Sequence, residues 1–439
     1  MSAKVQVAKA ASVALIGIEA TVIEVEAWIG SGLPRVTMVG LPDAALTQAK
    51  ERCRSALLSQ RFPWPSQVLT INLTPASLPK TGSHYDLSIS AAVLMAQGLL
   101  PTGCLADVVL MGELGLDGQV RAVRGLLPAL MGARRLGVTQ AIVPTEQLAE
   151  AALVDELVVR GVSNLRQLVE VLAGAPGEAP TIDMPVPVND SSRIDLNDVV
   201  GLAGAKACLE VAAAGRHHLY FHGPPGAGKT LLASCLPDIL PVLSAEEALE
   251  VAAIHSLAGI ALSRLPSRPP LADPHHTASL ASIIGGGARI ARPGAVSLAH
   301  RGVLFLDEAP EFSSSYLEAL RSPLESGEVV LSRSEMTVRY PARFQLVLTA
   351  NPCPCGFGAG SAKCRCAPSA VRRYASALSG PILDRVDLQC LVEPSRRMLS
   401  TPTQSDGPTT AQVATRVMEA RGRQSRRLRD TPWRTNSEV

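Results

Sequence analysis

The stretch HLYFHGPPGAGKT, residues 218–230, joins a short apolar run to a glycine-rich segment, and the helix-forming LLASCL follows it. A G-x-x-x-x-G-K-T pattern between a strand and a helix is typical of a loop that binds phosphate groups. Its glycines let several backbone N–H groups point at one phosphate chain, and the start of the helix adds positive potential. We therefore predict a nucleotide-binding segment, called the phosphate loop below, formed by Gly223, Pro224, Pro225, Gly226, Ala227, Gly228, Lys229 and Thr230.

Two residues of this loop have predicted roles of their own. Lys229 would reach the terminal phosphates of ATP, and Thr230 would offer a hydroxyl ligand to Mg²⁺. The alternative is a chance glycine-rich turn, which the flanking strand and helix patterns disfavour.

A second motif, Gly302-Val-Leu-Phe-Leu-Asp307-Glu308, places two acids directly after an apolar run. Such a run predicts a buried parallel strand, and ligands bind at the carboxyl ends of parallel strands. Asp307 would hold Mg²⁺, mostly through water, and Glu308 would polarise the water that attacks the γ-phosphate. The alternative is an ordinary buried strand that ends in surface acids.

A third apolar run, Phe344–Ala350, ends at Asn351. An amide at that strand end could orient the attacking water and sense the γ-phosphate. The alternative is a turn-forming asparagine before Pro352.

Four cysteines, Cys353, Cys355, Cys364 and Cys366, follow within 14 residues in a C-x-C-x₈-C-x-C pattern. Four thiolates could enclose a structural Zn²⁺, although C-x-C is a less typical spacing than C-x₂-C. A reduced loop without metal is the alternative. Catalytic zinc is disfavoured, because four thiolates leave no open coordination position.

Composition excludes several classes of protein. The chain has 439 residues, 47% of them hydrophobic and 18% charged, with a formal net charge of +2. These values exclude a largely disordered chain and a strongly basic coat for nucleic acid. The aromatic fraction of 3% disfavours base stacking as a main binding mode. Apolar runs such as Ile89–Ala96 are far shorter than the roughly 20 residues of a membrane span, and neither a signal peptide nor a disulfide scaffold is indicated.

Residue patterns divide the chain into blocks. Residues 1–172 alternate predicted strands with the helices Ala44–Gln60 and Leu87–Gln97, which indicates an α/β domain. The strands are predicted at Thr21–Ala27, Arg35–Val39, Val68–Asn72, Val108–Met111 and Ala141–Val143. A linker rich in proline and glycine, 173–193, precedes a second α/β block at 194–392. The remainder, 393–439, contains a basic helix candidate at Thr410–Leu428.

These motifs resemble the AAA+ ATPases of the magnesium-chelatase-like family. The resemblance rests on GPPGAGKT, FLDEAPEF, LTANPCPCG and LSGPILDRVDL, and it extends over residues from about 5 to 430. It implies a P-loop AAA+ domain with a parallel sheet, a homo-oligomeric ring, expected to be a hexamer, and DNA as substrate, with branch migration during natural transformation. In such rings an arginine stabilises charge in the neighbour's nucleotide site, and Arg385 holds the matching position. A salt bridge to Asp384 or Asp387 is the alternative for Arg385.

The first block resembles the Lon-protease-like fold, which is related to ribosomal protein S5 domain 2. The resemblance rests on Pro79-Lys80-x-Gly82, on the segment Gly112–Val120 and on Ala141–Pro144. The family's serine and lysine positions fall at about His84 and at Leu127, so we expect a scaffold or DNA-engaging domain without peptidase residues. A hidden site among Ser83, Ser88 and Ser90 is the alternative.

Arginines supply the candidate DNA contacts. A predicted hairpin, Glu328–Arg343, carries Arg333, Arg339 and Arg343, and Arg289 and Arg292 lie near a glycine run. The C-terminal helix candidate adds Arg416, Arg421, Arg423, Arg426, Arg427 and Arg429. The arginines of the hairpin and of the glycine run could equally belong to a solvated face. The C-terminal helix could contact DNA or a neighbouring subunit, although such a run is usually a solvated helix face. Relatives continue into a helical lid with a further arginine, whereas this sequence ends at Val439, so we expect a shortened lid region.

Taken together, the sequence predicts a cytoplasmic ATPase that uses ATP and Mg²⁺ and acts as a helicase or translocase on branched or single-stranded DNA, without a membrane partner. A magnesium-chelatase motor subunit, a peptidase and a nucleotide-binding adaptor without hydrolysis are the alternatives.

Overall fold

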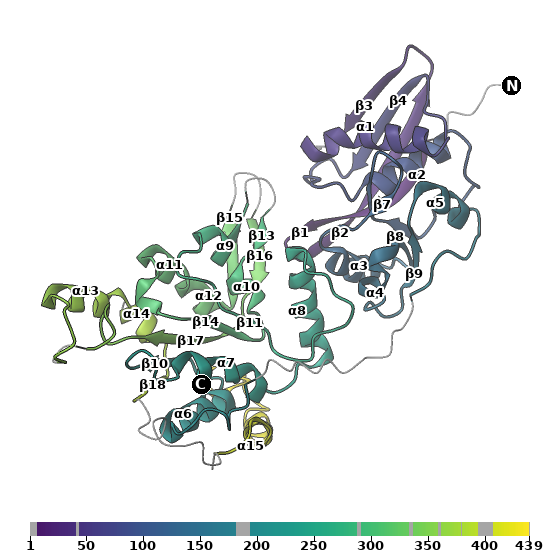
Figure 1. The fold of residues 1–439 in the computed structure, drawn as a ribbon. Coiled ribbons are helices and arrows are strands. Elements are labelled where there is room, and N and C mark those ends of the chain that lie inside the picture. Colours follow the sequence, from purple (N-terminus) through teal and green to yellow (C-terminus); the bar gives the residue numbers. More distant parts are fainter. Residues whose placement is uncertain are drawn as a thin grey trace. The chain divides into compact units, whose positions relative to one another are not determined.

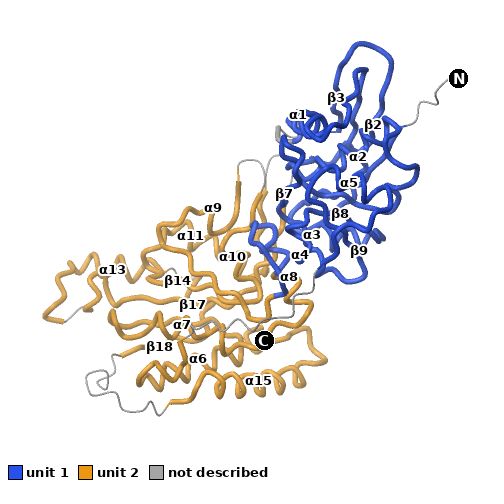
Figure 2. The backbone as a smooth tube through the Cα atoms, turned by 45° about the vertical axis from the view of Figure 1, so that its right-hand side comes forward, with its two compact units in different colours: residues 1–186, 252–265 blue, residues 187–251, 266–439 orange. Residues whose placement is uncertain are grey.

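The computed structural model describes residues 7–40, 44–180, 194–287, 291–332, 337–358, 361–378, 380–393 and 407–438. The chain divides into two compact units (Figure 2). Unit 1 contains residues 1–186 and 252–265, and unit 2 contains residues 187–251 and 266–439. Helix α8 (Ala245–Ala258) begins in unit 2 and ends in unit 1.

Unit 1 is built on a mixed seven-stranded sheet with the strand order β3-β4-β2-β1-β5-β8-β9. In chain order its strands are β1 (Ala8–Ile16), β2 (Glu19–Gly30), β3 (Arg35–Val39), β4 (Val68–Thr74), β5 (Val108–Leu110), β8 (Gln140–Pro144) and β9 (Val158–Val162). A separate two-stranded ribbon pairs β6 (Glu113–Leu114) with β7 (Val120–Arg121).

Helices cover both faces of this sheet. Successive residues of a strand point to opposite faces, so each face presents apolar side chains on which helices can pack. On β1, Ala10 and Ala14 belong to one hydrophobic cluster and Val13 to the other. The first cluster includes residues of α1 (Ala44–Ser59), α2 (Asp86–Ala96) and α5 (Leu165–Leu172). The second includes residues of α3 (Leu126–Arg135) and α4 (Leu148–Ala151), and η1 (Thr145–Gln147) precedes α4.

All five strands and both helices predicted for the first block are present, with ends shifted by a few residues. Strand β1 was not predicted, since its sequence AKAASVALI is rich in small residues and shows no clear alternation. Its nine residues nevertheless pair along their whole length with β2.

Unit 2 contains a five-stranded sheet in the order β11-β14-β17-β10-β18 (Figure 1). Its strands are β10 (Leu219–His222), β11 (Leu271–Ala272), β14 (Val303–Leu306), β17 (Gln345–Ala350) and β18 (Leu388–Leu391), and all neighbours pair in parallel. Every residue of β14 and β17 is buried, as the apolar runs predict. Strand β17 separates β10 from β14, so Asn351 follows the strand between those that lead to the phosphate loop and to Asp307.

The hydrophobic cluster behind this sheet includes residues of α6 (Ala203–Gly215), α7 (Lys229–Ile239) and α15 (Thr410–Arg427). Val413 and Val417 of α15 are buried there, so the predicted basic helix packs on the core of unit 2. The shorter helices of unit 2 are α9 (Leu280–Ile284), α10 (Ala295–Leu298), α11 (Ser314–Ala319), α12 (Arg321–Ser326), α13 (Pro368–Ala377), α14 (Gly380–Leu383), η2 (Ala309–Glu311) and η4 (Asn436–Glu438).

Two antiparallel ribbons complete unit 2. The predicted hairpin consists of β15 (Glu328–Ser332) and β16 (Thr337–Pro341), and a shorter ribbon pairs β12 (Gly285–Gly286) with β13 (Arg292–Pro293).

The assignment of residues 252–265 to unit 1 differs from the sequence analysis, which placed them in the second block. Ala252 belongs to the hydrophobic cluster of α3 and α4. In addition, Ser256 accepts a backbone hydrogen bond from Gly125, within the same unit. Across the described ranges, no helix combines the length and apolarity that a membrane crossing requires.

Candidate nucleotide site

The phosphate loop follows β10 and leads directly into α7, which begins at Lys229. Gly223 has no room for a side chain, because an added Cβ would lie 2.1 Å from the carbonyl oxygen of Val392. Gly228 adopts a φ of +89°, a conformation that other residues rarely adopt. Glycine is therefore required at both positions for steric reasons.

The ammonium of Lys229 lies inside this loop. Its Nζ donates to the carbonyl oxygens of Gly223 (2.7 Å) and Pro224 (2.9 Å) and to Oδ1 of Asn351 (3.1 Å). The side chain is buried, and burial lowers the pKa of Lys229 although two nearby carboxylates oppose this shift. The hydrogen-bond partners of this ammonium among the described residues are all uncharged, so the loop holds a buried positive charge that a polyphosphate would balance.

The acids at the end of β14 form a connected hydrogen-bond network. Thr230 Oγ1 donates to Oδ2 of Asp307 over 3.0 Å, and the hydroxyl of Thr349 donates to Oδ1 of the same carboxylate. The backbone N–H of Glu308 donates to Thr349 Oγ1 (3.0 Å), and Asn351 Nδ2 donates to Glu308 Oε1 (3.3 Å). Glu308 has a φ of +52°, which turns the chain sharply after the strand.

These side chains surround one cavity of about 280 Å³. It is lined by the phosphate loop from Pro225 to Thr230, and by Leu231, Asp307, Glu308, Thr349, Ala350 and Asn351. Thr230 Oγ1 and Asp307 Oδ2 lie 3.0 Å apart, and hydroxyl and carboxylate oxygens suit Mg²⁺ and the water molecules that it retains. The residues present therefore fit a nucleotide with its Mg²⁺ ion.

Thr349 is the member of this site that the sequence analysis missed. Its signal lies in the strand pairing, since Leu306 pairs with Leu348 and the next residues, Asp307 and Thr349, must then be neighbours. The hydroxyl is fully buried and joins the two acids, so it fixes their positions.

Arg385 does not line the cavity. It lies between α14 and β18 and forms an ion pair with Glu325 of α12. Glu325 is an acid that sequence spacing did not indicate. Asp387, one of the two predicted partners, accepts from the backbone N–H of His218.

The four predicted cysteine ligands come together. Their Sγ atoms all lie within 4.8 Å of one another, in the loop that follows Asn351.

The predicted DNA contacts have mixed environments. Arg289 and Arg333 lie outside the described residues. Arg339 pairs with Glu328 across the β15–β16 hairpin, and Arg292 is exposed. In α15, Arg416 forms two hydrogen bonds to Glu210 and Arg421 donates to the carbonyl oxygen of Ala213. These two arginines therefore attach α15 to α6.

The positions of unit 1 that the sequence analysis matched to the Lon-type serine and lysine hold His84 and Leu127. His84 Nε2 lies 2.8 Å from the carbonyl oxygen of Val13, and Leu127 is buried. The Ser83 hydroxyl donates to Glu113. Ser88 and Ser90 are fully buried within α2.

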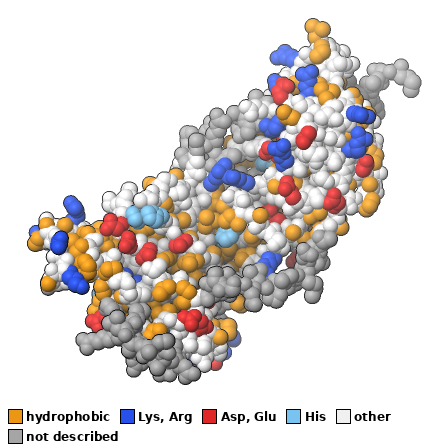
Figure 3. Space-filling view, in the orientation of Figure 1, with side chains coloured by type: hydrophobic (Ala, Val, Ile, Leu, Met, Phe, Trp, Pro, Cys, Tyr) orange, Lys and Arg blue, Asp and Glu red, His pale blue; other side chains and the backbone are white. Residues whose placement is uncertain are grey.

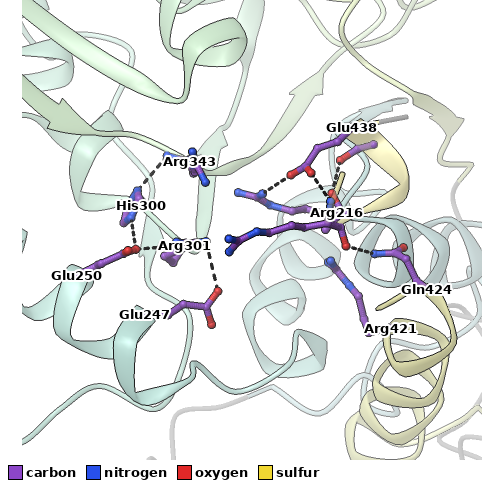
Figure 4. Close-up of polar contacts among 12 residues, drawn as sticks. Arg216, Glu247, Glu250, His300, Arg301, Arg343, Arg421, Gln424 and Glu438 are labelled. Carbon is purple, nitrogen blue, oxygen red and sulfur yellow. Dashed lines mark hydrogen bonds and ion pairs between the residues drawn. The ribbon is translucent and has the colours of Figure 1, made fainter. Parts of the chain in front are cut away.

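A second polar cluster lies at the opposite, amino edge of the unit 2 sheet (Figure 4). Three arginines each precede a strand of the parallel sheet by two or three residues, and they therefore lie at the same edge: Arg216, Arg301 and Arg343. Arg301 pairs with Glu247 and Glu250 of α8. This arrangement attaches the start of α8 to the sheet.

His300 belongs to the same cluster. Its Nε2 lies 3.0 Å from Glu250 and its Nδ1 accepts from the backbone N–H of Arg343. The hydrogen bond from His300 lowers the pKa of Glu250 to about 2, and burial lowers the pKa of His300. Both shifts favour a neutral imidazole that donates to an ionised carboxylate.

Comparison with known proteins agrees with the site geometry. The family model "Magnesium chelatase, subunit ChlI" matches residues 195–399, and "Subunit ChlI of Mg-chelatase" matches residues 25–147. An uncharacterized protein of Mycobacterium tuberculosis is 51% identical over 98% of this chain and 85% of its own length. Competence protein ComM of Haemophilus influenzae is 40% identical over 93% of this chain and 81% of its own length. The chain belongs to the magnesium-chelatase-like family, close to ComM.

The magnesium-chelatase-like family is of the AAA+ ATPase type, which accounts for the phosphate loop, the acids after β14 and the parallel sheet. ATP and Mg²⁺ are the ligands that this family implies. The magnesium-chelatase 38 kDa subunit of Rhodobacter capsulatus is more distant, with 28% identity over 35% of this chain and 49% of its own length.

Proposed function

We propose that this chain is a cytoplasmic ATP-hydrolysing motor that acts on branched or single-stranded DNA, as a branch-migration helicase in natural transformation or recombination. The motor would work as a homo-oligomeric ring, with a hexamer as the expected form. Unit 1 would be a Lon-like domain that serves as a scaffold or engages DNA.

The observation that carries the ATPase part is the common location of Lys229, Thr230, Asp307, Glu308 and Asn351 around one cavity. A Mg²⁺ ion held there by Thr230 and Asp307 would neutralise charge on the phosphates. Lys229 would bind the terminal phosphates by exchanging its carbonyl partners for phosphate oxygens. Glu308 would accept a proton from the attacking water, while Asn351 keeps the Glu308 carboxylate oriented.

The DNA part is supported by the 40% identity to a competence protein over most of the chain, since competence is the uptake and use of external DNA. Charge adds a second argument. Exposed basic residues occupy the cysteine loop and α13, namely Lys363, Arg365, Arg372 and Arg373. Figure 3 shows basic side chains at this end of unit 2. Local patches of this kind suit phosphate contacts in a chain of low net charge.

Phosphate release measured with forked, single-stranded and four-way DNA tests the proposal. We expect DNA to stimulate the wild-type rate, and the chain with ATP to move the branch point of a labelled four-way junction. The Glu308→Gln variant should bind ATP but should not move the branch point. Phosphate release that no DNA stimulates would contradict the DNA part, and no release at all would favour a nucleotide-binding adaptor.

A magnesium-chelatase motor subunit is the second candidate, since that family model matches residues 195–399. The two functions differ in the process that ATP hydrolysis drives, which is movement on DNA in one case and metal insertion in the other. ATP-dependent Mg²⁺ insertion into a porphyrin, in the presence of the other chelatase subunits and without any DNA effect, would favour this candidate.

A further inference from the structure

The loop that follows Asn351 brings four thiol groups together. The Sγ of Cys364 lies 3.8 Å from that of Cys353 and 3.7 Å from that of Cys355, and the Cys353–Cys355 separation is 3.3 Å. Cys366 Sγ lies within 4.8 Å of all three. Four Zn–S bonds of about 2.3 Å in a tetrahedron place the sulfur atoms about 3.8 Å apart, so a zinc ion fits with small shifts.

We infer that Cys353, Cys355, Cys364 and Cys366 bind one structural Zn²⁺ ion, which holds their loop against the phosphate loop. This assignment goes beyond the ATPase and DNA activities, because it concerns what keeps the nucleotide pocket in shape.

The surroundings of the sulfurs suit metal-bound thiolates. Four thiolates this close would repel one another, and a divalent cation between them offsets this repulsion. The backbone N–H of Gly358 donates to Cys353 Sγ over 3.3 Å, which is the kind of hydrogen bond that supports a metal ligand. Lys363 and Arg365 lie in the same loop and would balance the negative charge of a zinc ion with four thiolates.

Two features connect the cysteine cluster to the nucleotide pocket. Cys353 follows Asn351 by two residues, and Asn351 bonds both Lys229 and Glu308. Gly356 packs against the phosphate loop so closely that an added Cβ would lie 2.7 Å from Cγ of Pro225. A loop fixed by zinc therefore supports the phosphate loop and positions the asparagine.

Metal analysis tests the binding. The full chain, purified without chelator, should carry about one zinc per chain by inductively coupled plasma mass spectrometry. Cys353→Ser and Cys364→Ser should lose it, while Cys104→Ser and Cys208→Ser should keep it. Co²⁺ exchanged into the wild type should show the visible absorption of tetrahedral thiolate coordination.

Two results would overturn the metal assignment. One is a wild-type chain that binds neither Zn²⁺ nor Co²⁺ when these are added. The other is one iron per chain in place of zinc. Neither measurement requires ATP turnover, so failure of the metal site is distinguishable from failure of the proposed ATPase.

Two glycine variants test the positioning role. Gly356 and Gly137 have similar φ values, +83° and +92°, so alanine strains both in the same way. At Gly356 the new Cβ would lie 2.7 Å from Cγ of Pro225, whereas at Gly137, in unit 1, it would meet no atom of the described residues within 4 Å. We expect Gly356→Ala to keep its zinc and weaken ATP binding about tenfold, and Gly137→Ala to bind ATP like the wild type. Equal ATP affinities in the two variants would contradict the positioning role.

Discussion

Replacing Glu308 by glutamine separates nucleotide binding from hydrolysis. The side chain keeps its size, and the backbone N–H of residue 308 still donates to Asp307 (3.1 Å) and to Thr349 (3.0 Å). In the wild type, Asn351 Nδ2 donates to Glu308 Oε1 over 3.3 Å, and the amide oxygen of a glutamine can accept the same hydrogen bond. What disappears is the carboxylate that would accept a proton from the attacking water.

The expected loss follows from that change. Removing a general base lowers turnover by about 10²–10⁴-fold, which corresponds to about 3–5 kcal/mol in the barrier. ATP affinity should stay the same or increase, because the variant removes a negative charge beside the phosphates. The dissociation constant of ATP should therefore not rise by more than about threefold, or about 0.7 kcal/mol.

Steady-state phosphate release gives kcat, and equilibrium titration with a fluorescent ATP analogue gives the affinity. Glu311→Gln is the matched control, since Glu311 is an exposed acid that does not line the cavity. Its kcat should stay within about twofold of the wild type. A Glu308→Gln variant that retains most of its turnover would refute the assignment of the base.

Three further predictions follow from other residues. Thr349→Val removes the hydroxyl that donates to Asp307, so the Mg²⁺ concentration for half-maximal turnover should rise about tenfold, and Thr349→Ser should restore it. Burial lowers the pKa of His218 from 6.5 to about 4, so its contribution to stability is present above pH 6.5 and is lost as the pH falls towards 4. The free energy of unfolding measured with urea should fall by at most about 3 kcal/mol over this pH range, and the His218→Gln variant should show a smaller fall. Arg385→Ala should bind ATP without turnover, and mixing it with inactive Lys229→Ala chains should restore phosphate release if the arginine acts on a neighbouring chain.

Much of the nucleotide site could be predicted because its signals are local. The phosphate loop, the acids after β14 and Asn351 each follow an apolar run, and parallel strands bring such ends to one edge. Thr349 required one further step, the pairing of Leu306 with Leu348. Once that register is known, the hydroxyl beside Asp307 follows from it.

Other features depend on contacts between distant segments. The basic residues of the C-terminal helix indicated a solvated face, and Arg423, Arg426 and Arg427 are indeed exposed. What the sequence did not indicate is that Val413 and Val417 bury another side of this helix against α6 and α7. Arg385 pairs with Glu325, an acid 60 residues earlier in the chain. Cysteine spacing left open a zinc site or a reduced loop without metal, whereas the contact between Gly356 and Pro225 requires the tertiary fold.

Calorimetric titration of the chain with ATP in the presence of Mg²⁺ tests the central claim most directly. We predict one ATP site per chain in the wild type and in the control Lys9→Ala, an exposed lysine of unit 1 that does not line the cavity. Lys229→Ala should show no measurable binding, since it lacks the buried ammonium of the loop. Unchanged ATP affinity in Lys229→Ala would contradict the account.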